Sequence, residues 1–203
     1  MNPGLIVRDG YDRLGERYRD ADGIEPVRRW FLDETLRRIP NGADVLELGC
    51  GTGIDALELA AGRRYTGVDI SARMLASASR RVTDGRFIRS DVTAMDAPEA
   101  SFDAVVALYV LGHVPPAEHA PLFRSVHRWL RRGGVFCASF PVGDDDGVED
   151  DWLGVPMYFG GIGRVATENG LRRAGFTIEL GEERSGDDPA GGTETFFWAI
   201  ARR

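Results

Sequence analysis

Apolar runs of strand length alternate with segments of helical spacing through the middle of the chain. The strand-like runs are Ala43–Leu48, Tyr65–Asp69, Arg86–Ser90, Phe102–Leu108 and Gly134–Phe140. The helical patterns between them are Ile54–Ala61, Ala72–Arg81 and Ala117–Arg131. Strands that alternate with helices in this way predict a parallel sheet with helices on both faces, which is the doubly wound α/β class.

Further elements are predicted on either side of this unit. Leu5–Arg19 and Glu25–Ile39 have helical spacing, and we expect residues 1–40 to cap the open end of the sheet. After the unit, a short helix at Thr167–Ala174 is followed by two strands separated by a glycine-rich turn, at Phe176–Glu182 and Thr193–Ala201. This turn chemistry predicts a hairpin, so the sheet should end in an antiparallel pair. We expect residues 1–203 to form a single domain.

One long connection, residues 141–163, has two halves of opposite character. Acidic side chains crowd positions 144–151, whereas aromatic and apolar side chains follow among glycines at Trp152, Met157, Tyr158 and Phe159. The acids resist burial and the aromatic side chains favour it. We therefore expect a mobile substrate lid in which Trp152, Met157 and Tyr158 contact the substrate. The acids are interpreted as a solvated run, and the alternative is that they attract a cationic substrate.

The most informative stretch is a glycine turn between a strand and a helix, V-L-E-L-G-C-G-T-G at positions 45–53. Glycines let backbone amides approach a ligand closely. The third glycine comes one residue earlier than in the G-x-G-x-x-G pattern of dinucleotide sites, and Glu47 and Asp55 add negative charge beside the turn. This favours a ligand with an ammonium and a sulfonium over one with phosphates, and so disfavours a nicotinamide oxidoreductase.

Acidic residues also follow the next two predicted strands. Asp69 ends the second strand, where a carboxylate can accept hydrogen bonds from both hydroxyls of an adenosine ribose. Its alternative role, capping the next helix, suits Ser71 better. Asp91 follows the third strand, at the edge of the sheet where an adenine would lie.

These motifs occur in the order found in class I S-adenosylmethionine-dependent methyltransferases: E-L-G-C-G-T-G, V-D-I-S-x-x-M-L, D-V and S-F-D-A-V-V-A-L-Y-V-L-G-H-V. The chain resembles small-molecule members of this family, most strongly from Val45 to Val114. The resemblance implies a Rossmann-like, seven-stranded, mostly parallel sheet with an antiparallel last strand. It also implies S-adenosylmethionine as cofactor, a small-molecule methyl acceptor and S-adenosylhomocysteine as product.

The resemblance further implies which residues meet the cofactor. The methionine moiety is assigned to Glu47, Gly49 and Gly51, the ribose to Asp69, the adenine face to Met74 and the adenine edge to Asp91 and Val92. Tyr11 and Tyr18 are expected to close over the cofactor. Ile70 and Leu108 complete the expected cofactor set, and Tyr109 is a candidate acceptor contact.

His113, just past the fourth predicted strand, is the candidate general base. An imidazole can take a proton near neutral pH, and the alternative for His113 is a structural hydrogen bond. His119 and His127 are interpreted as surface residues. The histidines lack the spacing of metal ligands, and a methyl sulfonium is already activated, so we expect no metal.

Composition narrows the remaining classes. All 25 basic residues are arginine, which argues against a P-loop lysine or a Schiff-base lysine. The net charge of −7 disfavours a nucleic-acid partner, and pairs such as Arg28 and Arg29 are interpreted as solvated helix faces. No apolar run is long enough to span a membrane, so we expect a cytoplasmic enzyme. The alternative is a protein of the same fold that binds S-adenosylmethionine but catalyses another reaction or regulates.

Overall fold

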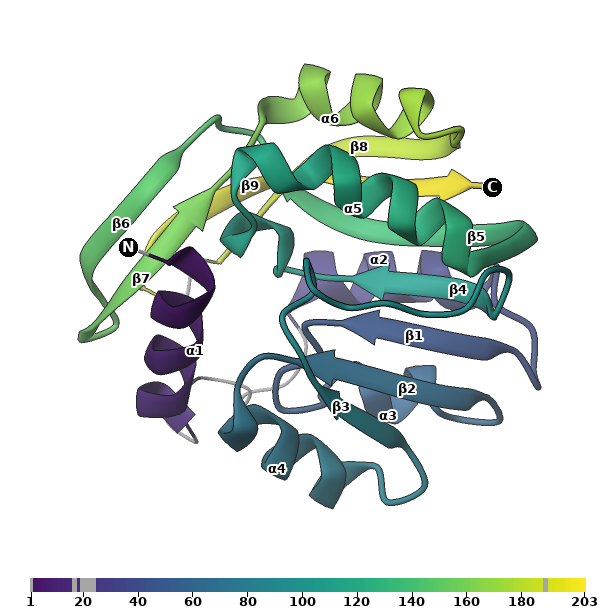
Figure 1. The fold of residues 1–203 in the computed structure, drawn as a ribbon, viewed down its shortest axis with the longest axis horizontal. Coiled ribbons are helices and arrows are strands. Elements are labelled where there is room, and N and C mark those ends of the chain that lie inside the picture. The colour runs from purple at the N-terminus through teal and green to yellow at the C-terminus, as the bar shows by residue number, and fades with distance from the viewer. Residues whose placement is uncertain (1, 16–17, 19–24, 188–189) are drawn as a thin grey trace.

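The computed structural model describes residues 2–15, 18, 25–187 and 190–203. Seven strands form one sheet in the order β3-β2-β1-β4-β5-β9-β8 (Figure 1). They are β1 (Asp44–Leu48), β2 (Arg64–Asp69), β3 (Arg86–Arg89), β4 (Phe102–Ala107), β5 (Leu130–Pro141), β8 (Thr177–Asp187) and β9 (Thr193–Arg202). The pairs from β3 through β5 are parallel, and β9 runs antiparallel to both β5 and β8. The predicted α/β class and the antiparallel last strand are confirmed.

The order of the strands reverses direction at β1, which lies between β2 and β4. From β1 the chain moves outward to β2 and β3, then returns to the other side of β1 with β4. In open α/β sheets, ligands bind outside the carboxyl ends of the strands at such a switch point. We therefore expect a ligand site at the loops after β1, β2 and β4.

Helices cover both faces of the sheet. Helices α5 (Pro116–Trp129) and α6 (Gly163–Arg173) lie on the viewer's side in Figure 1, and α2 (Pro26–Leu36) and α3 (Ala56–Leu59) lie behind. Trp129 of α5 is fully buried in the first layer, and Phe31 of α2 is fully buried in the second. Helix α4 (Ala72–Arg81) packs beside β2 and β3. We expected α2 at the open end of the sheet, but its buried Phe31 and Leu32 hold it against a face.

Helix α1 (Pro3–Leu14) does lie at the carboxyl end of the sheet, together with a separate hairpin of β6 (Asp146–Trp152) and β7 (Val155–Gly160). The hairpin occupies the predicted long connection, which is therefore regular structure. Its acids in β6 are exposed, whereas Trp152, Met157 and Tyr158 are buried against α1. Gly10 permits this contact, because a Cβ there would lie 2.7 Å from the Met157 methyl carbon. We call α1 and the hairpin together the α1–hairpin unit.

Several predicted helix ends were wrong; α6, for example, begins at Gly163 and not at Thr167, and α2 ends at Leu36 and not at Ile39. Helix α5 stops at Trp129 because Leu130 adopts an extended backbone and pairs with Phe102 as the first residue of β5. Helix α3 is a single turn, Ala56–Leu59, since the preceding residues belong to the glycine turn. Among the described residues, no helix is long and apolar enough to cross a membrane.

Candidate active site

A cavity of about 620 Å³ opens at the carboxyl ends of the central strands. This volume lies within the usual range for small-molecule sites. Its wall is built from residues 49–52 after β1, Asp69, Ile70 and Met74 after β2, residues 91–94 after β3 and residues 108–110 after β4. The remaining wall comes from α1, from Tyr18 and Arg28, from the short 3₁₀ helix Leu111–His113, and from Val114, Pro115, Glu118 and Ile54.

The glycine turn after β1 needs glycine at two positions for different reasons. Gly49 has a φ of +66°, and a Cβ there would lie 2.5 Å from the Val110 side chain. Gly51 has a φ of +53°, and a Cβ on it would meet no atom within 4 Å. Because Gly51 lines the cavity, its missing side chain leaves room there for a ligand. Next to it, the buried Thr52 hydroxyl has no hydrogen-bond partner among the described residues.

Asp69 lies at the end of β2 with its carboxylate in the cavity wall. It accepts hydrogen bonds from the Gly51 N–H at 2.9 Å and the Ser71 N–H at 2.8 Å. Burial raises the pKa of Asp69 to about 6, although these two N–H groups favour its charged form. A carboxylate has about four acceptor positions, so Asp69 keeps acceptor capacity for a ligand beside the N–H groups of Gly51, Ser71 and Ile70. Ser71 is the N-cap of α4, as expected, because its hydroxyl accepts from the Met74 N–H.

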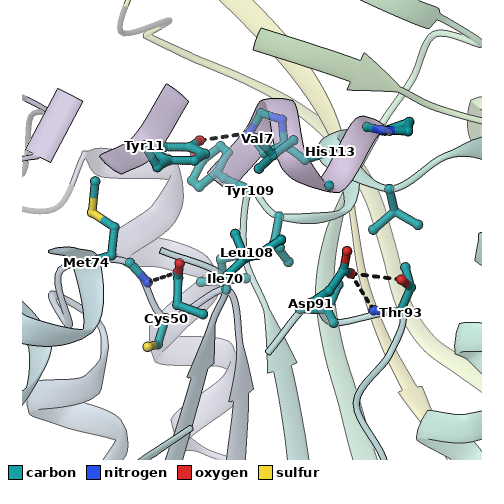
Figure 2. A pocket seen from close by; sticks show the side chains of 18 of the residues that line it. Val7, Tyr11, Cys50, Ile70, Met74, Asp91, Thr93, Leu108, Tyr109 and His113 are labelled. Atoms are coloured by element: carbon teal, nitrogen blue, oxygen red, sulfur yellow. Dashed lines mark hydrogen bonds between the residues drawn. The ribbon is translucent and has the colours of Figure 1, made fainter. Parts of the chain in front are cut away.

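Asp91 stands at the corresponding position after β3. One of its carboxylate oxygens accepts from both the N–H and the hydroxyl of Thr93, at 2.9 and 2.8 Å, as Figure 2 shows. A Cβ on Gly4 of α1 would lie 2.4 Å from the other oxygen, so α1 passes directly over Asp91. Val92, Ile70 and Leu108 supply apolar wall nearby.

Glu47 does not line the cavity, unlike the other residues expected to meet the cofactor. Its side chain is buried, and the Tyr65 hydroxyl of β2 donates to its carboxylate. Burial, together with the negative charge of Asp55, raises the pKa of Glu47 well above its usual value. The carboxyl group therefore lies in the interior beside Tyr65 and not in the cavity wall.

Arg28 of α2 is a cavity residue that the sequence interpretation missed. Its guanidinium donates to both carboxylate oxygens of Asp55, with the shortest contact at 2.6 Å, and the Asp55 side chain is fully buried. The expectation of a solvated Arg28 is therefore wrong, and the negative charge that the sequence places at Asp55 beside the glycine turn is paired with Arg28. The signal that could have found Arg28 is Asp55 itself, because a buried carboxylate needs a cationic partner.

Tyr109 follows β4 with an unusual backbone. Its φ is +57°, and the Ser139 hydroxyl accepts from its N–H at 2.8 Å. The Tyr109 hydroxyl donates to Glu25 at 2.6 Å, and the Arg28 guanidinium lies 5.5 Å from the ring centre. Strained backbone that is held by such contacts is typical of functional sites. Burial raises the pKa of Tyr109, so the phenol stays protonated.

Tyr11 and His113 meet across the cavity from α1 and the 3₁₀ helix. The Tyr11 hydroxyl lies 2.8 Å from Nε2 of His113, the contact drawn as a dashed line in Figure 2. The other ring nitrogen, Nδ1, lies 2.8 Å from the carbonyl oxygen of Tyr158. Tyr18 also lines the cavity, with its ring edge-to-face against Tyr11 at 5.1 Å.

The expected acceptor residues of the hairpin lie one layer behind this pair. Trp152, Met157 and Tyr158 are buried in the α1–hairpin unit and do not line the cavity. The Trp152 ring centre lies 6.0 Å from that of Tyr11 and 6.4 Å from that of His113. Met157 packs on Gly10 of α1, whereas the next residue of β7, Tyr158, points to the other face, where its hydroxyl donates to Asp146.

The other two histidines, His119 and His127, are not surface residues as expected. His119 was expected at the surface but is buried, and its Nε2 lies 3.1 Å from the Val114 carbonyl oxygen. His127 is half-buried against the Phe176 ring, because α5 packs on the sheet through this side. Across the described residues, no group of three or more His, Cys, Asp or Glu side chains could hold a metal ion.

Comparison with known proteins agrees with this geometry. A family model described as a methyltransferase domain matches residues 45–134. The chain is 35% identical over 118 residues to trans-aconitate 2-methyltransferase of Azoarcus sp. strain BH72, covering 56% of this chain and 46% of that protein. It is 30% identical over 166 residues to a ubiquinone biosynthesis O-methyltransferase of Methylocella silvestris, covering 68% of this chain and 63% of that protein.

Among solved structures, the DhpI–SAH complex superposes with a TM-score of 0.74 at 25% identity, covering 100% of this chain and 98% of that one. The fold, the cavity at the switch point and these matches together define one class of protein. The chain belongs to the class I S-adenosylmethionine-dependent methyltransferase family, whose cofactor is S-adenosylmethionine. It spans about half the length of the curated relatives it matches.

Proposed function

We propose that this protein transfers a methyl group from S-adenosylmethionine to a small-molecule acceptor. The observation that carries the proposal is the single row of groups along the cavity, in which the open glycine turn, Asp69 and Asp91 follow one another at the ends of β1, β2 and β3. This order matches the order of amino acid, ribose and base along the cofactor. The names of the relatives, a trans-aconitate and a ubiquinone-biosynthesis methyltransferase, support a small acceptor.

The residues present fit the cofactor. The remaining acceptor capacity of Asp69, which lines the cavity, suits the ribose hydroxyls, and the space in front of Gly51 together with the Thr52 hydroxyl suits the amino-acid end. Arg28, held by Asp55 in the same wall, is placed to face a carboxylate there. We assign the adenine edge to Asp91 and Val92 and its faces to Met74, Ile70 and Leu108.

The chain's own residues have a modest chemical task, because the bound cofactor supplies a methyl group that is already activated by its sulfonium. The protein must orient the acceptor and exclude water. Tyr11, Tyr18 and the rest of the α1–hairpin unit cover the cavity and perform both tasks. We infer a reducing, cytoplasmic setting from two buried free cysteines, Cys50 and Cys137, and the net charge of −7 gives no reason to expect nucleic acid as a partner.

Two measurements test the proposal. Calorimetric titration with S-adenosylhomocysteine should show saturable binding that Asp69→Ala weakens about 10- to 150-fold, since hydrogen bonds to charged groups contribute about 1.5–3 kcal/mol each. Asp187→Ala, in the exposed end of β8, is the matched control and should bind like the parent protein. Labelled methyl transfer from S-adenosylmethionine into a panel of metabolites then separates a methyltransferase from a protein that only binds the cofactor. Absence of binding by the parent protein rejects the proposal.

A further inference from the structure

The hydrogen bonds of His113 fix the positions of its protons. Its Nδ1 lies 2.8 Å from the Tyr158 carbonyl oxygen, which can only accept, so Nδ1 carries a proton. In the neutral ring Nε2 is then an acceptor, and the Tyr11 hydroxyl at 2.8 Å donates to it. The chain of donors therefore runs from Tyr11 to His113 to Tyr158. His113 can take one more proton at Nε2, and that proton can reach it from Tyr11.

The surroundings keep this pair neutral. Burial lowers the pKa of His113, although its bond to the Tyr158 carbonyl opposes the shift. Burial and the neighbouring Tyr18 raise the pKa of Tyr11. The elements packed against His113 present aromatic rings, with the Phe159 ring centre of β7 at 5.2 Å. Among the described residues, the titratable groups around the pair include Tyr18, Tyr158, and Asp69 and Glu194, whose negative charges further raise the pKa of Tyr11; Asp146 accepts from the Tyr158 hydroxyl at 2.7 Å on the hairpin.

We propose that Tyr11 and His113 form a proton-accepting pair for a neutral hydroxyl acceptor, with Tyr11 in contact with the acceptor and His113 behind it. This inference rests on the proposed function. As the acceptor oxygen forms its bond to the methyl carbon, the carbon–sulfur bond breaks and its electron pair stays on sulfur. The acceptor O–H proton passes to the Tyr11 oxygen, while the Tyr11 proton passes to Nε2 of His113. The products are a methyl ether, a neutral thioether and a protonated imidazole, which later loses its proton to water.

The chemistry of the cavity wall selects this class of acceptor. Tyr11 and His113 line the cavity together with Val7 and Tyr18, which are apolar or neutral, whereas the charged residues of the same wall are Arg28, Asp69, Asp91 and Glu118. An acceptor with a full charge that is held against Val7, Tyr11, Tyr18 and His113 would lose its hydration without gaining an ion pair from these four side chains. A carboxylate acceptor also has no proton to give up, and an ammonium must lose one before it can react. A phenol or alcohol has both the neutral charge and the proton that this pair is arranged to receive.

The first test determines the tautomer and the pKa of His113 and does not require turnover. Long-range proton–nitrogen correlation spectra of protein labelled with ¹⁵N-histidine report the tautomer and the pKa of each ring. We expect His113 to be the Nδ1–H tautomer at pH 7, with a pKa below the usual 6.5. Tyr11→Phe keeps the ring packing but removes the hydroxyl, so it should shift the Nε2 resonance and leave Nδ1 unchanged. His113→Asn assigns the signals by deleting one set.

The second test measures acceptor preference in the complex with S-adenosylhomocysteine. Three probes of similar size are titrated: phenol, anisole, which lacks the hydroxyl proton, and benzoate, which is charged. The parent protein should prefer phenol to anisole by about 2- to 12-fold, which corresponds to one hydrogen bond. Tyr11→Phe should lose that preference while it still binds S-adenosylhomocysteine. Thr177→Val, which removes an exposed hydroxyl at the other end of β8, is the control and should keep it.

The outcomes separate this inference from the function on which it rests. If the parent protein fails to bind S-adenosylhomocysteine, the proposed function fails. If it binds S-adenosylhomocysteine, any of three results overturns the proton-accepting pair: an Nε2–H or charged His113 at pH 7, no saturable binding of phenol, or a preference for phenol that survives in Tyr11→Phe. The pair is supported when the Nδ1–H tautomer and the loss of preference are both observed.

Discussion

Asp69 combines a structural and a binding task in one buried carboxylate. Its two bonds to the Gly51 and Ser71 N–H groups hold the ends of β1 and β2 together, and its remaining acceptor positions face the cavity. Burial and the nearby Asp12 raise its pKa to about 6, so the ligand-free protein takes up a proton at Asp69 in mildly acidic solution. A protonated carboxyl group is a poorer acceptor for ribose hydroxyls.

This shift predicts the pH dependence of cofactor binding. The affinity for S-adenosylhomocysteine should be constant from pH 8 to 7 and fall by up to about tenfold per pH unit below pH 6, because one proton must leave Asp69 on binding. Asp69→Asn cannot titrate, so its weaker affinity should lack this step. Calorimetric titrations between pH 5 and 8 check both curves. The same pH profile in parent and variant would assign the step to another group.

The pairing of Arg28 with Asp55 allows stability and binding to be separated. Arg28→Leu leaves the fully buried Asp55 carboxylate without its partner, which costs about 3–5 kcal/mol of unfolding free energy, and it should also weaken cofactor binding. The double variant Arg28→Leu with Asp55→Leu should recover most of the stability but not the affinity. Denaturant unfolding and calorimetry measure the two quantities.

Arg29 provides the matched control on the same helix. It pairs with Glu58 and Asp33, and all three side chains are at least one-third exposed. Exposed pairs contribute about 0–1 kcal/mol, so Arg29→Leu should change stability little and affinity not at all. If the Arg28 double variant regained full affinity, Arg28 would be only a structural partner of Asp55.

At the level of elements, the sequence predicted what local chemistry determines. Helix α4 was placed at Ala72–Arg81 because Ser71 offers its N-cap. The carboxylates of Asp69 and Asp91 and the glycine turn were expected together, since the carboxyl ends of parallel strands share one edge of the sheet. Local patterns cannot show which side chains meet across 27 residues of chain, so the contact of Arg28 with Asp55 was missed.

The hairpin shows the same limit. Its polarity correctly predicted exposed acids and buried aromatic side chains, but not the partner that buries them. Residues 147, 149 and 157–159 take their places from strand pairing and from contact with α1, and neither leaves a local signal in a loop-like composition. The side chains expected to touch the acceptor therefore support Tyr11 and His113 from behind.

The supporting role of the hairpin predicts the effect of Trp152→Ala. This side chain is buried among Tyr11, Tyr18, His113 and Phe159, so truncation should cost about 3–5 kcal/mol of local stability in the α1–hairpin unit. Val148→Ala, on the exposed side of the same hairpin, should stay within about 0.5 kcal/mol of the parent protein. Amide hydrogen exchange in α1 and β7 measures the difference. Equal exchange in both variants would show that Trp152 does not support the unit.

The whole molecule has hydrophobic clusters of unequal size. Two large clusters lie on the two faces of the sheet and join its strands to α2, α3, α5 and α6. The third belongs to the α1–hairpin unit and has six buried residues: Val7, Leu14, Trp152, Val155, Met157 and Tyr158. Hydrogen bonds also join α1 to the rest of the fold. The Tyr11 hydroxyl bonds to His113, and the Asp12 carboxylate accepts from the Ser71 hydroxyl and from the Arg73 N–H. A unit with so small a core can open while the sheet stays folded.

Because the unit covers the cavity, its opening should control the entry and release of ligand. In the ligand-free protein, amides of α1 and β7 should exchange by local opening, at a lower free energy than amides of β4 and β5. At a concentration of S-adenosylhomocysteine one hundred times its Kd, openings that release the ligand cost about 2.7 kcal/mol more. Exchange in α1 should therefore slow about 100-fold, whereas amides of Ile178 and Ala201, at the end of the β8–β9 pair away from the cavity, should not change. Exchange in α1 that is equally fast with and without the ligand would mean that the unit opens without releasing it, and the route into the cavity would then lie elsewhere.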